Sequence, residues 1–375
     1  MVDKDCPNLS FASIDWNWDC PNFKKSEIDR YWDYPCLGFV SRWLTRIAPI
    51  SKNLKLIGIG TMAKRKFYRY PLYLLARLAA EFLLILPRSW ALALASGVGH
   101  GGYRLVSRQR TKILENLKLA YGDTKSSVEL EAIGRRVLGH MLQTAVDFLR
   151  FATLSRDRVV SIVETGDAYS FCKDVLQEGR GLIIMTAHLG NWELLAGSFC
   201  LQGFKGAVIG RRIYYEPYNR WIVGLRSAVG VQTIYQDEAV RQVHVHLKAG
   251  GIIGLLPDQD RDHTRGIFVD FFGKPAHTSV APVKFAMASG APILPAFMVR
   301  MPGNRYKLLL GNLIRPKIEG GDRTASIRKY TEAWMKDFEE VIRRYPEQWG
   351  WMHDRWKTKS EDVTVAELKE TVKSS

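Results

Sequence analysis

From residue 181 onward, short apolar runs alternate with segments in which apolar residues recur at helical spacing. The apolar runs predict strands, and the segments between them predict helices. The predicted strands are 181–187, 205–210, 251–257, 292–299 and 306–314. The predicted helices are 191–202, 216–229, 237–249, 279–289 and 324–344, preceded by a wholly helical pattern over 108–156. This alternation is typical of an α/β fold in which helices flank a mostly parallel central sheet.

Residues 71–99 are the most membrane-like stretch of the chain. They predict one apolar helix over 72–86 and a shorter one over 89–98, and Arg77 is expected to pair with Glu81 one turn later. A spanning helix needs about 20 predominantly apolar residues, which neither segment supplies. We therefore expect an N-terminal membrane-anchoring helical segment that dips into the cytoplasmic leaflet. A spanning helix and an ordinary buried helix pair are the alternatives.

Residues 1–61 differ in composition from the rest of the chain. They are rich in Asp, Asn, Trp and Pro, and they lack both clear periodicity and the apolar core of a secretory signal. Met62 then opens a basic segment that resembles a natural N-terminus. We therefore predict that 1–61 are an atypical extension, and we hypothesise that it arises from an upstream start codon. The predicted division continues with a basic and apolar membrane-anchor region in 62–107, a catalytic α/β domain in 108–360 and a polar tail in 361–375.

The chain is strongly basic, with a formal net charge of +16 at pH 7. Residues 1–61 hold 8 basic and 7 acidic side chains, whereas residues 62–122 hold 11 basic and 2 acidic ones and so contribute +9. A basic surface attracts polyanions. Eleven tryptophans, and a basic region interleaved with apolar runs, favour an anionic membrane. No helix-turn-helix, zinc-finger or RNA-binding motif supports nucleic acid as a partner.

The five cysteines are Cys6, Cys20, Cys36, Cys172 and Cys200. Their number is odd and none has CxxC spacing, so we predict reduced thiols rather than a disulfide framework or a zinc site. Reduced thiols favour a cytoplasmic environment for the reactive part of the chain.

The most informative motif follows the apolar run 181–187, where His188 stands five residues before Glu193. Their side chains meet only if the chain turns between them, and Gly190-Asn191 is a plausible turn. Glu193 is then expected to accept a hydrogen bond from one imidazole nitrogen, which leaves the other nitrogen to take a proton from a hydroxyl. The alternative is a capped strand-to-helix turn in which His188 only satisfies backbone groups.

Polar residues also follow the predicted strand 251–257, where the chain reads Asp258-Gln259-Asp260. Ligands gather beyond the carboxyl ends of the strands in open α/β sheets, so these residues could line one crevice with His188. The two carboxylates could bind a metal or form a polar turn. Because no thiolate stands nearby and no zinc-type ligand spacing is present, we expect no metal site.

Arg211-Arg212 follow the predicted strand 205–210, and Arg226 lies one helix later. Guanidinium groups fit phosphates and carboxylates, although a solvated arginine is the alternative for each residue taken singly. In a basic crevice with His188 they are candidates for holding an anionic substrate or a developing oxyanion. No Gly-x-Ser-x-Gly elbow or P-loop is present, so a serine hydrolase or an NTPase has no support.

Four motif blocks, in order along the chain, resemble those of the bacterial lipid A biosynthesis acyltransferases. These are the lauroyl and myristoyl transferases of the lysophospholipid acyltransferase superfamily. The blocks are 186–193; 212–217 with Arg226; 257–259, 269–276, Thr278 and 290–297; and 345–349, 351–353 and 355–358. The resemblance covers roughly residues 66–360 and implies a glycerolipid acyltransferase-like fold. Ile213 stands where the family usually has a proline, a departure that bears on the acceptor more than on the reaction.

The resemblance implies that a fatty acyl group moves from an acyl carrier protein or coenzyme A thioester to a hydroxyl of a lipid A precursor. His188 would deprotonate that hydroxyl and Glu193 would orient its imidazolium. Arg212 would hold the acceptor's phosphate or steady the oxyanion. The residues expected to bind substrate are Arg212, Asn191, Asp258, Gln259 and Arg226.

The same resemblance implies a thioester co-substrate with no further cofactor, a phosphorylated glycolipid acceptor and contact with anionic inner-membrane lipids. It implies an active site on the cytoplasmic side of the inner membrane. Three alternatives stay open. The acceptor could be a lysophospholipid or a phosphatidylinositol mannoside, the enzyme could be a lipid hydrolase in which His188 and Glu193 activate water, or the chain could be a non-catalytic membrane adaptor.

Overall fold

The computed structural model describes residues 68–260 and 266–359, all of which fall in one compact unit. The predicted extension 1–61 and the predicted tail 361–375 lie outside the described residues, as do the cysteines Cys6, Cys20 and Cys36.

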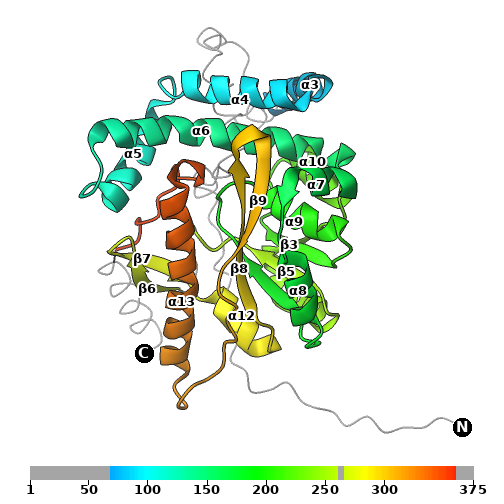
Figure 1. The fold of residues 1–375 in the computed structure, drawn as a ribbon, viewed down its shortest axis with the longest axis vertical. Helices are drawn as coiled ribbons and strands as arrows, with labels where there is room; N and C mark the ends of the chain where they lie inside the picture. Colours follow the sequence, from blue (N-terminus) through cyan, green and yellow to red (C-terminus); the bar gives the residue numbers. More distant parts are fainter. Residues whose placement is uncertain (1–67, 261–265, 360–375) are drawn as a thin grey trace, which may run out of the picture. The chain divides into compact units, whose positions relative to one another are not determined.

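A seven-stranded sheet forms the centre of this part of the chain, in the order β1-β9-β8-β2-β5-β3-β4 (Figure 1). Its strands are β1 Val163–Glu164, β2 Leu182–Met185, β3 Gly206–Gly210, β4 Gln232–Tyr235, β5 Ile252–Leu255, β8 Ile293–Met301 and β9 Arg305–Leu310. Strands β8, β2, β5, β3 and β4 run parallel, and β9 runs antiparallel to β8. The mostly parallel sheet is therefore confirmed, and all the predicted strands are present.

Helices cover both faces of the sheet, as predicted. One face carries α7 Arg156–Ile162, α8 Ala168–Leu176, α9 Trp192–Leu201 and α10 Glu216–Ala228, and the other carries α11 Ala239–Lys248, α12 Ala281–Ser289 and α13 Arg323–Arg344. Strand β2 shows why both faces of the sheet are covered. Leu182 and Ile184 pack with α8 and α9, whereas Ile183 and Met185 join the opposite core. Successive side chains of a strand point to opposite faces, so a strand covered on both sides is apolar throughout.

Three parts of the β structure are absent from the sequence prediction. They are β1, β4 and a separate antiparallel hairpin of β6 Gly266–Phe271 and β7 Lys274–Ser279. Strand β4 is short and begins with two polar residues, and β7 contains Pro275, so both read locally as loops. Their extended conformation is stabilised by the strands they pair with, which a local pattern does not contain.

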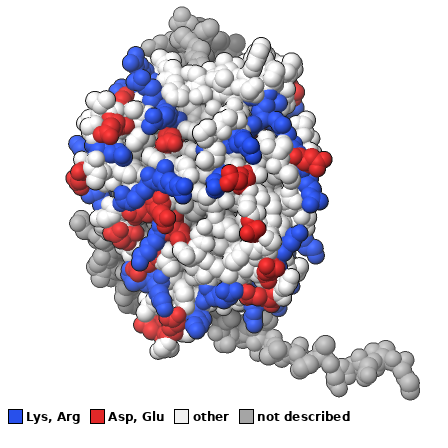
Figure 2. All heavy atoms as spheres, in the orientation of Figure 1, with Lys and Arg blue, Asp and Glu red and all other residues white. Residues whose placement is uncertain are grey.

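Two apolar helices, α3 Arg69–Ile85 and α4 Arg88–Gly102, correspond to the predicted pair, and Arg77 bonds Glu81 at 3.1 Å as expected. Within residues 68–260 and 266–359, no helix is both long and apolar enough to cross a membrane. The exposed large apolar side chains of α3 and α4 are Tyr70, Leu74, Leu75, Leu78, Phe82, Ile85, Trp90, Leu94 and Val98. At the top of Figure 2, where these helices lie, a broad area carries no charged side chains and borders a group of Lys and Arg.

The predicted helical region 108–156 forms α5 Ser107–Tyr121 and α6 Ser127–Leu149 before α7 begins. Helix α4 crosses α6 closely because two glycines meet there: a Cβ on Gly99 would lie 2.5 Å from Gly139 N. Further along α6, the Thr144 hydroxyl donates to Gly190 O at 2.7 Å. Helix α6 therefore connects the α3–α4 pair to the turn that follows β2.

Candidate active site

His188 and Asp258 meet at the carboxyl ends of two neighbouring strands. Strands β2 and β5 are parallel, with Leu182 opposite Ile252, so the residues that follow them reach the same edge of the sheet. His188 Nδ1 lies 2.8 Å from Asp258 Oδ1, and the His188 backbone N–H donates to Asp258 Oδ2 at 2.8 Å. The two motifs therefore meet at one edge of the sheet, as predicted, and the crevice expected there stays a prediction.

Asp258 is held as a buried carboxylate. Its side chain is 2% exposed, and Trp349 Nε1 donates a further hydrogen bond to Oδ2 at 2.9 Å. Burial by itself would raise the pKa of Asp258, but the attraction of His188 and the hydrogen bonds from it hold that pKa below its usual value. Asp258 is therefore ionised at neutral pH.

This carboxylate fixes the tautomer of His188. An ionised carboxylate only accepts hydrogen bonds, so Nδ1 of His188 carries the proton and Nε2 holds the lone pair. Nε2 makes no hydrogen bond to any residue in the described ranges. The arrangement can accept a proton from a substrate at Nε2 and stabilise the resulting imidazolium through Asp258.

The predicted pairing of His188 with Glu193 is wrong. Both carboxylate oxygens of Glu193 bond to Arg226, at 3.0 Å from Nε and 2.6 Å from Nη2. Glu193 stands in the first turn of α9, and Arg226 stands in the last turn of α10. The carboxylate that orients His188 is instead Asp258, 70 residues away in the sequence.

Gly190 and Asn191 form the turn between β2 and α9, as predicted. Gly190 has a φ of +61°, and a Cβ there would lie 2.1 Å from Met298 O, so only glycine fits. Asn191 caps α9: its Oδ1 accepts from Leu194 N at 2.9 Å, and its Nδ2 donates to the Tyr306 hydroxyl at 3.1 Å. These bonds make Asn191 part of the turn, and its contact with substrate stays a prediction.

The other residues expected to bind substrate lie at different distances from the pair. Gln259 borders it, with Nε2 3.5 Å from His188 Nδ1. Arg226 is engaged in the ion pair described above. Arg212 follows β3 on the exposed surface, where its guanidinium carbon lies 3.9 Å from the centre of the Tyr235 ring. The structure thus brings Asp258 and Gln259 to His188, and the substrate contacts of all these residues stay predictions.

Asp260 has partners of its own. Its oxygens accept from Thr358 N at 2.7 Å and from the Thr358 hydroxyl at 2.9 Å, and His277 Nδ1 lies 3.3 Å away. These bonds connect the C-terminal segment to the β6–β7 hairpin. Over residues 68–260 and 266–359, no group of three or more His, Cys, Asp or Glu side chains is arranged to hold a metal ion.

The C-terminal segment supplies residues to which sequence reasoning gave no individual role. Gly350 N–H donates to His188 O at 2.9 Å, which holds this segment beside the pair. The His353 ring lies 6.4 Å from the His188 ring and 5.1 Å from the Trp349 ring, between centres. Among the described residues neither ring nitrogen of His353 has a hydrogen-bond partner, although both are shielded from solvent, and burial lowers the pKa of His353 to about 4. In the sequence, only the family resemblance pointed to these residues, through its last motif block at 345–349, 351–353 and 355–358.

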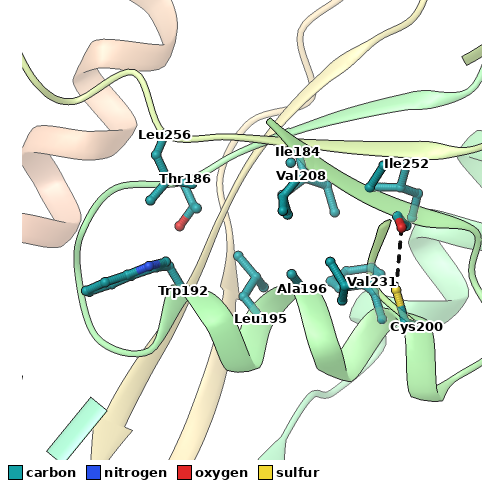
Figure 3. A pocket seen from close by; sticks show the side chains of 14 residues that line it. Ile184, Thr186, Trp192, Leu195, Ala196, Cys200, Val208, Val231, Ile252 and Leu256 are labelled. Carbon is teal, nitrogen blue, oxygen red and sulfur yellow. Dashed lines mark hydrogen bonds between the residues drawn. The ribbon is translucent and has the colours of Figure 1, made fainter. Parts of the chain in front are cut away.

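A small apolar cavity of about 30 Å³ is lined at one end by Thr186 and Trp192, which stand close to His188 in the sequence (Figure 3). The Trp192 ring contacts the His188 ring edge to face, with 5.1 Å between centres. Figure 3 shows Thr186 and Trp192 at one end of the cavity, and Cys200 and Val231 at the other. Its walls come from α9 and from strands β2, β3 and β5. The cavity is apolar, and its free volume is close to the space that one water molecule occupies in the liquid.

The sequence of the chain matches a family model described as "Bacterial lipid A biosynthesis acyltransferase" over residues 25–358. This match agrees with the resemblance carried by the ordered motifs. It begins inside the segment 1–61, so its start differs from the predicted boundary at Met62.

Named relatives are similar at modest identity. Phosphatidylinositol mannoside acyltransferase of Mycobacterium tuberculosis (strain ATCC 25618 / H37Rv) is 24% identical over 277 residues, 72% of this chain and 82% of that protein. Lipid A biosynthesis lauroyltransferase of Escherichia coli (strain K12) is 28% identical over 195 residues, 51% of this chain and 61% of that protein. Lipid A biosynthesis palmitoleoyltransferase of the same organism is 26% identical over 198 residues, 50% of this chain and 59% of that protein.

Proposed function

The chain belongs to the bacterial lipid A biosynthesis acyltransferase family, and on that premise we propose that it transfers a fatty acyl group from an acyl carrier protein or coenzyme A thioester to a hydroxyl of a lipid A precursor. The observation that carries the proposal is the His188–Asp258 pair beside an apolar cavity. A general base without a neighbouring protein nucleophile suits direct transfer between two bound substrates.

The proposed reaction needs only this pair to move the proton. His188 Nε2 removes the proton of the acceptor hydroxyl as its oxygen attacks the thioester carbonyl carbon. Asp258 stabilises the imidazolium through the Nδ1–H bond. Collapse of the tetrahedral intermediate breaks the carbon–sulfur bond, and His188 returns its proton to the leaving thiolate. The ester and the free thiol leave, and the protein is unchanged.

We assign the apolar cavity to the acyl chain of the donor. Thr186 and Trp192 lie two residues before and four residues after His188, so a chain that enters at their end keeps its carbonyl near Nε2. The cavity is narrow in this structure, so a long chain would have to displace side chains of α9. Burial of the chain supplies about 0.8 kcal/mol per methylene group, which favours this displacement.

We assign the outer faces of α3 and α4 to the cytoplasmic surface of the inner membrane. Exposed Leu78 and Phe82 lie among the apolar side chains of these helices, and the chain carries a net charge of +16. Apolar insertion combined with attraction to anionic lipids binds proteins to one leaflet. Leu78→Glu should weaken sedimentation with phosphatidylglycerol vesicles. Val128→Glu, at an exposed position of α6, should not. Equal binding of both variants would contradict this assignment.

The acceptor has a second candidate. The Mycobacterium tuberculosis relative, named for phosphatidylinositol mannoside, is matched over a larger share of both chains than the Escherichia coli lauroyltransferase. This coverage favours another phosphorylated glycolipid as the alternative acceptor. Exposed Arg212 and the nearby Gln259 are the proposed contacts of the acceptor headgroup, because guanidinium groups bind phosphate oxygens well.

The decisive experiment is mass spectrometry of total lipids from a Gram-negative host that lacks its late lipid A acyltransferases. Cells that carry the chain are compared with cells that carry His188→Ala. A lipid A species heavier by one acyl group, present only with intact His188, supports the proposal. Unchanged lipid A together with a newly acylated phospholipid or mannoside keeps the acyltransferase and overturns the acceptor.

A purified-enzyme assay separates the donor and the hydrolase alternative. Membrane-reconstituted protein is given the acyl thioester of carrier protein or of coenzyme A, with and without the lipid A precursor. Acyl transfer that depends on the precursor supports the proposal and identifies the faster donor. Free fatty acid released at the same rate without acceptor would mean that His188 activates water, and would overturn it.

A further inference from the structure

A second cavity, of about 240 Å³, lies beside the turn that joins α3 to α4. It is separate from the cavity next to His188, and the two share no lining residue. Three arginines and one carboxylate line it: Arg88, Arg150, Arg158 and Asp147. Thr153, Leu154, Ile162 and Leu194 complete its walls.

The charges around this cavity do not balance. Asp147 accepts hydrogen bonds from Arg88 Nε at 2.7 Å and from Arg88 Nη2 at 3.0 Å. The same carboxylate lies 3.3 Å from Arg300 Nη2. One negative charge therefore already faces two guanidinium groups, and it cannot also neutralise Arg150 and Arg158.

Arg150 and Arg158 have donors that the protein leaves unused. Arg150 Nη2 donates to two carbonyl oxygens at the end of α3, but its Nε is buried and has no hydrogen-bond partner in the part of the chain that the structure describes. Burial lowers the pKa of Arg150, and the charges of Arg88 and Arg158 lower it further against the opposing effect of Asp147. The side chain of Arg158 is exposed, and within the described ranges it makes no hydrogen bond or ion pair, so its donors are open to a ligand from solvent. A bound anion would relieve this repulsion.

The cavity also adjoins an apolar surface. Arg88 begins α4, and Arg150 bonds the carbonyl oxygens of Leu83 and Leu86, so the cavity meets the turn between exposed Ile85 and Trp90. A membrane phospholipid presents the complementary sequence of groups, with apolar chains followed by a phosphate. Arginine binds phosphate through paired N–H donors, and its stem packs against apolar groups.

We propose that this cavity binds the phosphate group of a membrane lipid, with a glycerol-like headgroup in the remaining volume. This is a binding site additional to the proposed reaction, and it does not depend on which acceptor is acylated. The bound headgroup would hold α3 and α4 against α6 and α7. It would thereby set the depth at which the His188 site meets the membrane.

The test begins with a soluble probe of the headgroup. Full-length protein is titrated with glycerol 3-phosphate, with inorganic phosphate and with sodium chloride at matched ionic strength, and binding is followed by thermal stabilisation. Arg158→Gln removes the least engaged guanidinium, and Arg156→Gln on the same helix removes an equal charge outside the cavity. Loss of charge-assisted hydrogen bonds should weaken glycerol 3-phosphate binding about tenfold in Arg158→Gln alone.

A second experiment, with lipid vesicles, tests whether the bound phosphate comes from a lipid headgroup or from free phosphate. Both variants are sedimented with vesicles of phosphatidylcholine containing phosphatidylglycerol. Weaker binding of Arg158→Gln than of Arg156→Gln supports the lipid site. If both variants bind vesicles alike while inorganic phosphate binds at least as tightly as glycerol 3-phosphate, the cavity takes free phosphate and the lipid assignment is overturned. No saturable binding of either probe, or equal loss in both variants, overturns the site itself.

Discussion

The carboxylate of Glu193 lies against the guanidinium of Arg226 through two hydrogen bonds, and both side chains are only 11% exposed. Removing one partner would leave the other charge poorly hydrated. We therefore expect Glu193→Ala to lower the free energy of unfolding by about 3 kcal/mol. Glu193→Gln, which keeps one acceptor, should lower it less. Chemical denaturation of the purified variants measures both values, and an unchanged stability in Glu193→Ala would contradict a structural role.

For Asp258 we expect a large loss of turnover, in contrast to the loss of stability expected for Glu193. In Asp258→Asn, the side-chain amide can donate to Nδ1 of His188, which moves the imidazole proton to Nε2 and abolishes the base. We expect turnover to fall by about 10²–10⁴-fold with a small change in KM. Glu193→Gln serves as the comparison, because it alters a carboxylate that does not contact His188. A greater loss of turnover in Glu193→Gln than in Asp258→Asn would return the orienting role to Glu193.

The turn at Gly190 should tolerate no side chain. The φ of +61° disfavours any other residue, and an added Cβ would lie 2.1 Å from Met298 O. We expect Gly190→Ala to cost more than the roughly 1–3 kcal/mol of backbone strain alone, because β8 would also have to move. Gly166 has a φ of +50° and no atom within 4 Å of its ideal Cβ, so Gly166→Ala isolates the strain. Thermal unfolding compares the loss of stability in Gly190→Ala with that in Gly166→Ala. Equal melting temperatures would show that the steric clash with Met298 O adds nothing to the backbone strain.

Two shielded histidines predict how stability depends on pH. Burial lowers the pKa of His140 to about 3 and that of His353 to about 4. The unfolded chain binds these protons near pH 6.5, so it holds more protons than the folded chain below that pH. Stability is therefore full above about pH 6.5 and falls as the pH drops toward 4. For His353 the fall is at most about 3 kcal/mol.

The measurement is the free energy of unfolding between pH 7 and pH 5. The wild-type protein should lose stability over this range. His353→Gln should lose less of it, because glutamine does not titrate. An identical slope in His353→Gln and in the wild type would show that the pKa of this histidine is the same in the folded and unfolded chains, which contradicts the prediction.

The elements of the fold could largely be predicted from local pattern. Strands β2 and β5 are apolar throughout because both faces are covered, and this pattern is visible in the sequence. Helices α3 and α4 were visible as apolar segments, although many of their apolar side chains are exposed. Strand β4 and the β6–β7 hairpin were not, because pairing rather than composition stabilises them.

The site was predicted less completely than the fold. His188, Asp258 and the turn at Gly190 followed from their positions after strands. The choice of Glu193 as the partner of His188 relied on closeness in sequence. The true pairing depends on β2 and β5 being neighbours in the sheet, and strand order is a long-range property. For the same reason the sequence did not reveal the role of Trp349, which donates a hydrogen bond to Asp258 although the two residues are 91 positions apart in the chain.

The preferred acyl-chain length could not be predicted from the sequence. The structure allows a prediction of how Cys200 affects that preference. This residue lies at the end of the apolar cavity opposite Trp192, and its thiol faces Gly206 O at 3.9 Å (Figure 3). Cys200→Phe should shorten the space for a chain. Each methylene group that no longer fits should reduce kcat/KM by about tenfold or more, so preference should move to shorter donors.

Competition between thioesters of different chain length measures this preference in the wild type and in the variants. Cys200→Ser removes the thiol without enlarging the side chain and should keep the wild-type preference, which controls for loss of the thiol itself. A larger residue in a packed core costs about 1–3 kcal/mol, so the folded fraction of Cys200→Phe must be determined in the same preparation. If Cys200→Phe slows every donor by the same factor, the cavity does not hold the acyl chain, because a pocket of fixed depth must discriminate by length.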